Sequence, residues 1–404
     1  MTAGSTYPQE LNFRHLVVLY QTLQTGSVEL VAERIHLSKP AVYQAIKRLE
    51  SVVGVRLFER HGGGELTEEG QVLAQRVGRA LQHFAAFNRS SQQQGERRDV
   101  IRSLTDPQLR SLIEVVRHGS YAIAAVHLNL TESSVHRTAR SLENLLNREL
   151  FVRKAKGVEA TLEARQLARQ ASLAYAEIRQ GLDEINQLTG QRGASLSIGC
   201  LPLARTDLLP ESITLFLNNY PNTFVSLLDG PYDEQLNALL HGDIDFILGA
   251  TRTSPPSDDV VQTVLFNDEL GLVMRANHPA LQLGDAEKHF GELNGYGWIA
   301  PRQGTPTRTI FSQLFTHFDV PEPEHLLECS SLVAIRGLLV RSDRIALLSK
   351  RQVRPEIEAG QLAVLDLSPE FSRPIGLTKR KGWHPTAVQQ AFMDQLLTVV
   401  KRDY

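Results

Sequence analysis

The stretch Leu37-Ser38-Lys39-Pro40-Ala41-Val42 decides how this chain of 404 residues is organised. It returns 93 residues later as Leu130-Thr131-Glu132-Ser133-Ser134-Val135, inside a longer segment that is repeated at the same offset. An internal repeat means that one structural unit is built twice, so both copies have to be assigned together. We call residues 1–93 copy one and residues 100–190 copy two.

Each copy has the pattern of a winged helix-turn-helix. In copy one, apolar residues at helical spacing predict a helix around Leu16 to Leu23 and a shorter one over residues 28–35. Ser38 can then cap a helix from about Lys39 to Val53, whose first turn tolerates a proline because its N–H groups have no partner within the helix. The glycine-rich residues 61–65 that follow predict a wing, and copy two repeats the same order.

A helix-turn-helix places its second helix in the major groove, so the start and the exposed face of that helix should reach the DNA. In copy one we expect DNA contacts from Ser38, Lys39, Pro40, Tyr43, Gln44, Lys47, Arg48 and Arg60. Gln44 could pair with adenine, whereas the lysines and arginines would hold phosphates. In copy two the expected contacts are Arg137, Arg140 and Lys154. Glu132 stands there in the place of Lys39 and should repel phosphates, so copy two either binds adjacent DNA or acts as a dimerisation and spacing element.

A long amphipathic helix follows each wing, over residues 67–88 and 161–188. A helix that extends from a small domain has little of its own chain to cover its apolar stripe, so we expect these helices to pair between protomers. Two-fold pairing would give a homodimer or homotetramer and a DNA target made of paired half-sites. The polar residues 90–99 predict a flexible joint between the copies.

From residue 195 onward, short β-rich runs alternate with helices, which favours a parallel α/β sheet. Ligands of such sheets lie beyond the carboxyl ends of the strands, where helix N-termini offer free N–H groups. The residues expected there are Leu201, Arg205, Thr251, Arg252, Arg302, Thr305, Arg308 and Ser330. The arginines among them would favour a carboxylate, sulfonate or phosphate group, although some could be ordinary exposed loop residues.

Composition narrows the function further. The net charge of -2 means that any DNA affinity must come from local clusters of lysine and arginine. Cys200 and Cys329 lack the spacing of a zinc site or a disulfide framework, which suits the cytoplasm, and no apolar run approaches the roughly 18 residues of a membrane span. The sequence contains no P-loop, dinucleotide-binding, nucleophile-elbow or zincin motif, and its 13 histidines are scattered. We therefore expect neither an enzyme nor a bound metal or cofactor.

The chain resembles a LysR-type transcriptional regulator that carries an additional winged helix-turn-helix. In copy one the resemblance rests on Ser38 to Val42, Ile46-Lys47-Arg48-Leu49-Glu50, Leu57-Phe58-Glu59-Arg60 and Leu66-Thr67-Glu68-Glu69-Gly70. In the C-terminal half it rests on Leu196-Ser197-Ile198-Gly199, Gly242-Asp243-Ile244-Asp245-Phe246 and Asn277-His278-Pro279. Copy one departs from the family at Tyr43 and Gln44, so base preference cannot be carried over.

The resemblance implies a multidomain fold, in which two winged helix-turn-helix domains with linker helices precede an α/β effector-binding domain over residues 194–404. That domain would contain two subdomains like those of periplasmic binding proteins, about 194–267 with 373–404, and about 268–372, with the ligand cleft between them. It also implies a ligand-responsive regulator that binds double-stranded DNA, changes its oligomer geometry on promoter DNA when effector binds, and has RNA polymerase as a candidate partner. The alternative is a cytosolic small-molecule binding protein whose helical domains contact other proteins.

Overall fold

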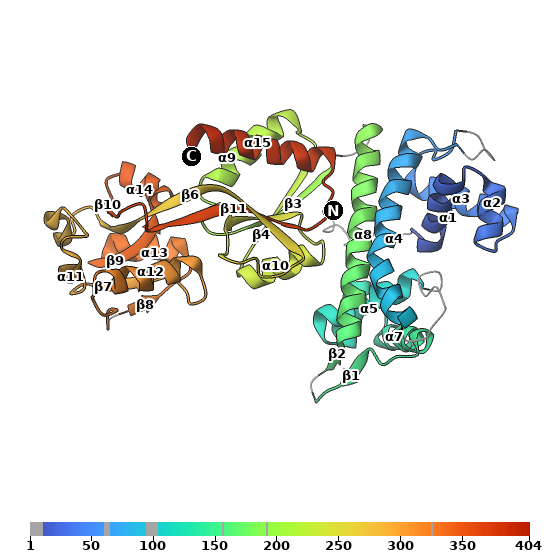
Figure 1. Ribbon diagram of the computed structural model, residues 1–404, viewed down its shortest axis with the longest axis horizontal. Helices are drawn as coiled ribbons and strands as arrows, with labels where there is room; N and C mark the ends of the chain where they lie inside the picture. The colour runs from blue at the N-terminus through green and yellow to red at the C-terminus, as the bar shows by residue number, and fades with distance from the viewer. Residues whose placement is uncertain (1–10, 60–64, 94–103, 156, 191–192, 325) are drawn as a thin grey trace. The chain divides into compact units, whose positions relative to one another are not determined.

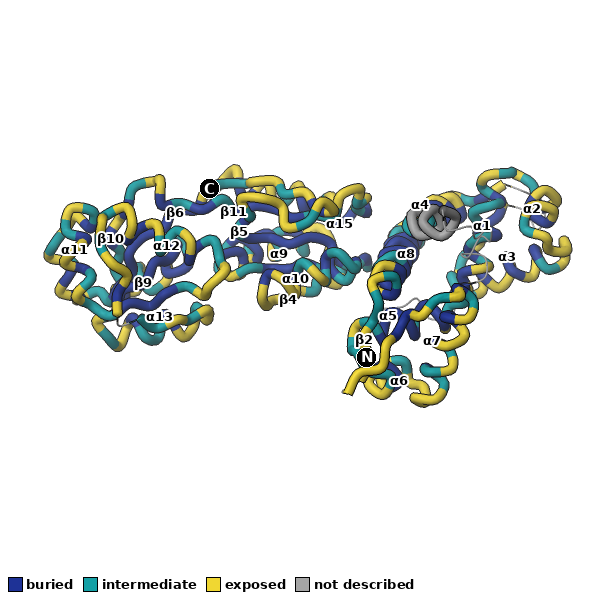
Figure 2. Tube along the Cα trace, turned by 60° about the horizontal axis from the view of Figure 1, so that its bottom comes forward, coloured by how far each residue is buried: buried dark blue, intermediate teal, exposed yellow. Residues whose placement is uncertain are grey.

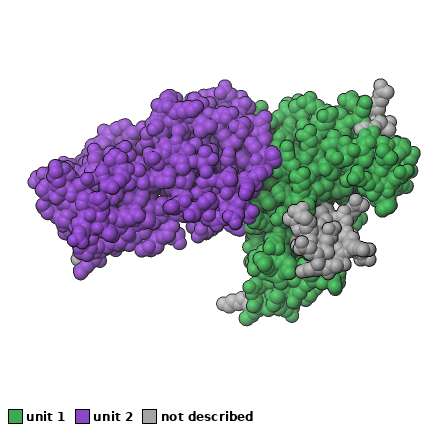
Figure 3. All heavy atoms as spheres, in the orientation of Figure 1, with its two compact units in different colours: residues 1–195, 222–224, 240–243 green, residues 196–221, 225–239, 244–404 purple. Residues whose placement is uncertain are grey.

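The computed structural model describes residues 11–59, 65–93, 104–155, 157–190, 193–324 and 326–404, with backbone alone for residues 86–93. The chain forms two compact units (Figure 3). Unit 1 comprises residues 1–195, 222–224 and 240–243, and unit 2 comprises residues 196–221, 225–239 and 244–404. No helix in the described part of the chain is both long and apolar enough to cross a lipid bilayer.

Unit 1 contains both copies of the repeat, and each copy folds as three short helices followed by a long one (Figure 1). Side chains cap the helices as the sequence predicts: the hydroxyl of Ser38 accepts a hydrogen bond from the Ala41 N–H, and Thr131 accepts one from the Ser134 N–H. Copy one consists of α1 (Phe13–Thr25), α2 (Val28–Arg34), α3 (Lys39–Val53) and α4 (Glu68–Gln93). Copy two consists of α5 (Asp106–His118), α6 (Tyr121–Leu128), α7 (Glu132–Leu146), β1 (Phe151–Arg153), β2 (Val158–Ala160) and α8 (Leu162–Leu188).

A glutamate on the second helix of each helix-turn-helix holds the start of the wing. The Glu50 carboxylate accepts a hydrogen bond from the Leu57 N–H at 2.9 Å, and the Glu143 carboxylate accepts one from the Leu150 N–H at 2.8 Å. Copy two then forms a two-stranded wing, β1 with β2. In copy one the described residues form a single β-bridge at the base of the predicted wing, Phe58 with Leu66, and the tip between them lies outside the described residues.

The two long helices pair with each other inside one chain, which corrects the expected pairing between protomers. α4 and α8 lie side by side, and Arg76 near the start of α4 meets Glu184 near the end of α8, so the helices run in opposite directions (Figure 1). The predicted apolar stripes are therefore covered by their own chain: Leu73, Val77 and Phe84 of α4 are buried. α8 is buried along much of its length (Figure 2). The backbone also corrects the predicted joint, because residues 90–93 belong to α4.

An arginine lies at the centre of this helix pair. The Arg76 side chain is 2% exposed and donates hydrogen bonds to Glu184 at 2.9 Å, to Glu177 at 3.1 Å and to the Gln180 amide oxygen at 2.8 Å. Burial disfavours the guanidinium charge, but the hydrogen bond and charge of Glu184, together with Glu177, outweigh it and raise the pKa of Arg76. Gly181 makes room for this contact, since a Cβ there would come 3.0 Å from the Arg76 side chain.

Unit 2 is built on a mixed sheet rather than the predicted parallel one. Its strand order is β4-β3-β5-β11-β6-β9-β7-β8, with β10 also paired to β6. The strands are β3 (Ser195–Cys200), β4 (Phe224–Asp229), β5 (Phe246–Ala250), β6 (Val260–Arg275), β7 (Gly297–Ala300), β8 (Leu326–Glu328), β9 (Arg344–Ser349), β10 (Leu362–Asp366) and β11 (Ser372–Arg380). The helices are α9 (Leu208–Asn219), α10 (Tyr232–Leu240), α11 (Phe290–Leu293), α12 (Pro306–His317), α13 (Leu332–Arg341), α14 (Arg354–Glu358) and α15 (Ala387–Asp403).

Two long antiparallel strands explain the difference. β3–β5 and β7–β8–β9 are parallel as expected, but β6 and β11 pair antiparallel and run through the middle of the sheet (Figure 1). β11 contains Pro374 and Gly376, two residue types that argue against a strand when only the sequence is read, and the strand pairing shifts register at Gly376. A Cβ at Gly376 would come 2.2 Å from the Thr263 carbonyl oxygen, so glycine is needed where the strands approach. The predicted subdomain boundaries near residues 267 and 373 fall on these strands and stay a prediction.

Arg76→Ala should destabilise unit 1 strongly, because the carboxylates of Glu177 and Glu184 would remain between the helices without the guanidinium. Breaking a buried ion pair from one side costs about 3–5 kcal/mol. Urea unfolding followed by far-ultraviolet circular dichroism measures the loss. Both tryptophans, Trp298 and Trp383, belong to unit 2, so the tryptophan fluorescence transition should not move.

Arg79→Ala is the matched control for this variant, since Arg79 is a partly exposed arginine on the same helix. Its substitution should change stability by less than about 0.5 kcal/mol. Equal losses in the two variants would show that the Arg76 network does not hold the helices together.

Candidate DNA-binding surface and effector cavity

The second helix of copy one presents its predicted contact residues to solvent. Seven of the eight predicted residues are described, and all seven are exposed at the start or on the outer face of α3, namely Ser38, Lys39, Pro40, Tyr43, Gln44, Lys47 and Arg48. Arg60, the eighth, lies outside the described residues. The opposite face of α3 packs into the core through Val42, Ile46 and Leu49, which fixes the direction of the exposed face.

Of the described predicted cations on this surface, only Lys39 forms an ion pair with a described residue of the protein. The Lys39 ammonium pairs with Glu29 of α2 at 3.0 Å, and its hydrogen bond is the main cause of the lowered pKa of Glu29. Both side chains are about half exposed, so the pair can open towards a phosphate. Behind the helix, burial and then the charge of Arg48 lower the pKa of His15. Lys47 and Arg48 form no ion pair with a carboxylate in the described part of the chain.

In copy two, two of the three predicted contact residues are paired with carboxylates. Arg140 pairs with Glu143 at 2.9 Å, and Lys154 pairs with Glu159 across the wing at 2.9 Å, where the lysine lowers the pKa of Glu159. Arg137 is exposed, and no carboxylate among the described residues forms an ion pair with it. The three predicted residues are thus all on the surface, but two of them are already paired within copy two.

Unit 2 holds a cavity of about 350 Å³. Most of the residues predicted to bind an effector line it, namely Leu201, Arg205, Arg252, Arg302, Thr305 and Ser330. They follow the carboxyl ends of β3, β5, β7 and β8, which is where parallel strands leave their ligands. The cavity also receives the first turns of two helices, because Thr305 caps α12 and Ser331 caps α13. Their N–H groups add positive partial charge to the wall.

Arginines dominate the polar lining, with four of them against the single carboxylate of Asp229. Arg205 pairs with Asp229. Arg252 lies over the Tyr232 ring, 4.3 Å from its centre, and donates a hydrogen bond to the Gly304 carbonyl. Burial raises the pKa of the Tyr232 phenol, and it also raises that of the Cys200 thiol at the end of β3. Both groups therefore favour the neutral form, and of the two only Tyr232 lines the cavity.

Two predicted residues do not belong to the cavity lining. Thr251 is buried in the sheet, where its N–H donates a hydrogen bond to the Pro374 carbonyl at 2.9 Å. This bond forms because β11 pairs with β5, a neighbour that the predicted parallel sheet did not include. Arg308 pairs with Glu322 at 2.7 Å and lies over the Phe311 ring.

The residue that the sequence interpretation missed is Arg373. It lines the cavity from β11, where it pairs with the buried Asp268 at 3.0 Å and donates hydrogen bonds to Thr307 and Gln352. Ser349 donates a further hydrogen bond to Asp268 at 2.6 Å. A buried charge needs such partners. In the sequence, residue 373 served only as a predicted subdomain boundary, and no local pattern marks its arginine as a cavity residue.

These features define a regulator class: helix-turn-helix heads that present cations to solvent, and a separate unit with a ligand cavity. The sequence profile of the bacterial regulatory helix-turn-helix protein, lysR family, matches residues 13–71 and again residues 107–165. The profile of the LysR substrate binding domain matches residues 189–401. The chain belongs to the LysR family of transcriptional regulators, with the helix-turn-helix domain in tandem. It is a ligand-responsive DNA-binding regulator and not an enzyme.

Relatives agree with this assignment. The HTH-type transcriptional regulator GalR of Pseudomonas putida strain KT2440 is 29% identical over 392 residues, which cover 96% of this chain and 97% of that protein. That alignment therefore includes both copies. The regulator PcaQ of Agrobacterium fabrum strain C58 is 26% identical over 279 residues, 69% of this chain and 89% of PcaQ.

Solved structures share the fold. Full-length OxyR from Pseudomonas aeruginosa superposes with a TM-score of 0.54 at 17% identity, and covers 74% of this chain and 95% of its own. Full-length CbnR in complex with its target DNA gives a TM-score of 0.50 at 19% identity, and covers 74% and 99%.

Arg373→Met should destabilise unit 2, because Asp268 would keep its buried charge and lose its ion-pair partner. The expected cost is about 3–5 kcal/mol, measured from the tryptophan fluorescence transition in urea. Arg302→Met is the control, since Arg302 is an exposed arginine of the same cavity and should change stability by less than about 0.5 kcal/mol. If both variants unfold at the same urea concentration, Arg373 does not organise the cavity wall.

Proposed function

We propose that this regulator reads promoter DNA mainly through α3 of copy one and that its effector is a small anion bound in the unit 2 cavity. The observation that carries the DNA part is the exposed face of α3, on which Gln44, Lys47 and Arg48 stand clear of the domain core. CbnR, whose fold this chain shares, has been solved with its target DNA. The cellular location consistent with this role is the cytoplasm.

Copy two has a structural role and a lesser role at the DNA. It supplies α8, the helix that covers the apolar stripe of α4, and it thereby holds the two heads in one unit. Among the predicted contact residues of copy two, Arg137 is the one that forms no ion pair with a described carboxylate, while Arg140 and Lys154 pair with carboxylates of the same domain. Copy two thus spaces copy one and contacts the backbone of adjacent DNA through Arg137, which combines the two alternatives left open by the sequence.

The oligomer is a homodimer or homotetramer whose contacts lie outside the α4 stripe, since that stripe is buried within the chain. The protomers would have two arrangements on DNA, and the effector would favour the one that it binds more tightly. The size of the shift would depend on the difference between the effector's affinities for the two arrangements. RNA polymerase is the partner through which such a change would reach transcription.

Substitutions on α3 should weaken binding to a fragment taken from upstream of the protein's own gene. Lys47→Ala and Arg48→Ala should each lower the slope of log affinity against log salt by about 0.9 for a lost phosphate contact. Gln44→Ala should instead reduce discrimination between target and scrambled DNA, by about 1–3 kcal/mol if the amide pairs with a base. Gel-shift titrations at several salt concentrations separate the two effects.

Two controls complete this experiment. Lys288→Ala removes an exposed lysine of unit 2 and should leave both slope and affinity unchanged. If Arg137 of copy two contacts a phosphate, Arg137→Ala should reduce the magnitude of the salt slope by the same amount as the loss of one phosphate contact in copy one. Wild-type affinity in the Lys47, Arg48 and Gln44 variants would remove α3 as the reading helix.

An anionic effector is supported by the cavity wall, in which four arginines and two helix N-termini face a volume of about 350 Å³. That volume suits a small organic molecule rather than a polymer. Arginine binds carboxylate and phosphate in a planar, two-point geometry that a neutral ligand cannot match. We infer a ligand that combines one such group with an apolar body, since Ile299, Leu332 and Ile335 also line the cavity.

Benzoate and benzamide form a matched pair of probes for this inference, with inorganic phosphate as a third. Thermal-shift titrations should show benzoate stabilising the wild type more than benzamide, and Arg252→Met should weaken the benzoate effect at least about tenfold, since hydrogen bonds to charged groups contribute about 1.5–3 kcal/mol. Arg308→Met should not, because Arg308 faces Glu322 outside the cavity. Equal responses to benzoate and benzamide would argue against an anion site.

A further inference from the structure

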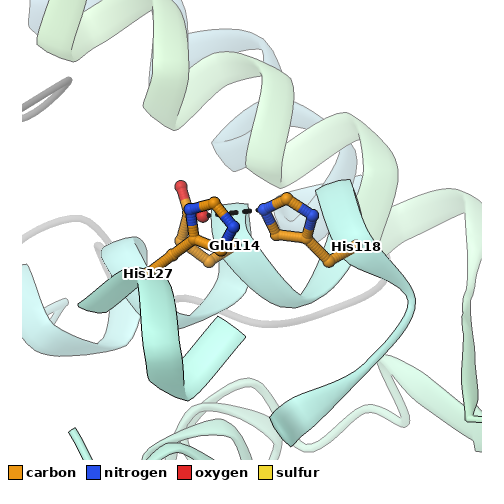
Figure 4. Close-up of side chains that lie close together, drawn as sticks. All are labelled: Glu114, His118 and His127. Atoms are coloured by element: carbon orange, nitrogen blue, oxygen red, sulfur yellow. Dashed lines mark hydrogen bonds and ion pairs between the residues drawn. The ribbon is translucent and has the colours of Figure 1, made fainter. Parts of the chain in front are cut away.

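Three side chains that are not among the predicted DNA-contact residues come together on copy two. Glu114 and His118 lie one turn apart on α5, and His127 reaches them from α6 (Figure 4). Their nearest ligand atoms all lie within 4.8 Å of one another. The spacing of Glu114 and His118 is visible in the sequence, but His127 joins them only because Gly119, at a φ of 61°, turns the chain back into α6.

The geometry already brings the donor atoms close. His118 Nε2 lies 3.2 Å from a Glu114 carboxylate oxygen, and the rings of His118 and His127 stack with their centres 4.2 Å apart (Figure 4). Glu114 is buried, His118 is half-buried and His127 is exposed, so the cluster opens to solvent on the α6 side. A further charged side chain at the cluster is Arg117. One nitrogen of its guanidinium lies 3.4 Å from the second Glu114 carboxylate oxygen, and another forms an ion pair with Asp243 of the same unit.

Copy one provides an internal comparison. The residues at the equivalent positions are Gln21, Thr25 and Arg34, of which the arginine would repel a cation. The helices α1 and α2 are otherwise built in the same way as α5 and α6. Two imidazoles and a carboxylate have therefore replaced non-ligating side chains at all three positions of one copy, a change that the helix-turn-helix fold does not itself require.

We propose that Glu114, His118 and His127 bind a divalent transition-metal ion, with Zn²⁺ as the fitting class. Two imidazole nitrogens and one carboxylate oxygen are a known zinc ligand set, with the fourth tetrahedral position left to water. The ion would draw the ligand atoms in from their present separation by a rotation of the exposed His127 side chain. It would clamp α6 onto α5, and so fix the helix that precedes α7.

Metal titration of the untagged, chelator-treated full-length protein tests this proposal. Co²⁺ is the probe, because its visible absorption reports tetrahedral coordination, and Zn²⁺ should displace it. We expect uptake of one ion per chain. His127→Ala should lower Co²⁺ and Zn²⁺ affinity at least about tenfold, as even loss of a group that only supports a ligand costs that much. His127 is exposed, so circular dichroism should show an intact fold.

The matched control is His289→Ala in unit 2, which removes a surface histidine that also contacts a glutamate, Glu292 at 2.9 Å, but that belongs to no group of three metal-ligating side chains among the described residues. It should bind metal as the wild type does. The proposal is overturned if the wild type takes up no more Co²⁺ than His127→Ala, or if His289→Ala loses as much affinity as His127→Ala. Glu114→Gln provides a second variant, since it keeps the shape of the buried side chain and should also lose affinity.

Discussion

The ion-paired contact between α4 and α8 is the constraint on which unit 1 depends. Each helix-turn-helix is a small domain, and the helix that leaves it exposes an apolar stripe that the domain cannot cover. Because the chain carries the unit twice, the second long helix covers the first. Arg76 fixes the register of the two helices, because its guanidinium finds hydrogen-bond partners only beside Glu177, Gln180 and Glu184. Apolar contacts alone would tolerate sliding by a turn, whereas a buried charge does not.

Unit 2 depends on a comparable device. β6 and β11 cross the sheet antiparallel to their neighbours and carry Asp268 and Arg373 side by side at its centre. From there Arg373 also contacts Thr307 at the start of α12 and Gln352 beyond β9. Residues distant in sequence are thus joined through one guanidinium beside the cavity. A ligand anion placed near it would enter a network that already connects β6 and β11 with the start of α12 and with Gln352.

The sequence predicted what depends on local signals. Caps such as Ser38 and Thr131, the periodicity of the helices and the carboxyl ends of the parallel strands all led to the right elements, and six of the eight expected effector residues line the cavity. Misses arose where the deciding partner was remote. The apolar stripe of α4 is the same whether a second protomer or α8 covers it, and Thr251 is excluded from the cavity only because β11 pairs with β5. Arg373 and the His118 and His127 pair were likewise invisible until the fold brought them together.

The covalent pairing of two heads has a consequence for symmetry. Identical subunits related by a two-fold axis present the same side chains to both halves of a site and therefore favour palindromes. In this chain the two heads are free to diverge: Lys39 and Gln44 correspond to Glu132 and Arg137. A single polypeptide thus carries two heads with different exposed side chains, and their one-to-one stoichiometry is set by the gene rather than by association.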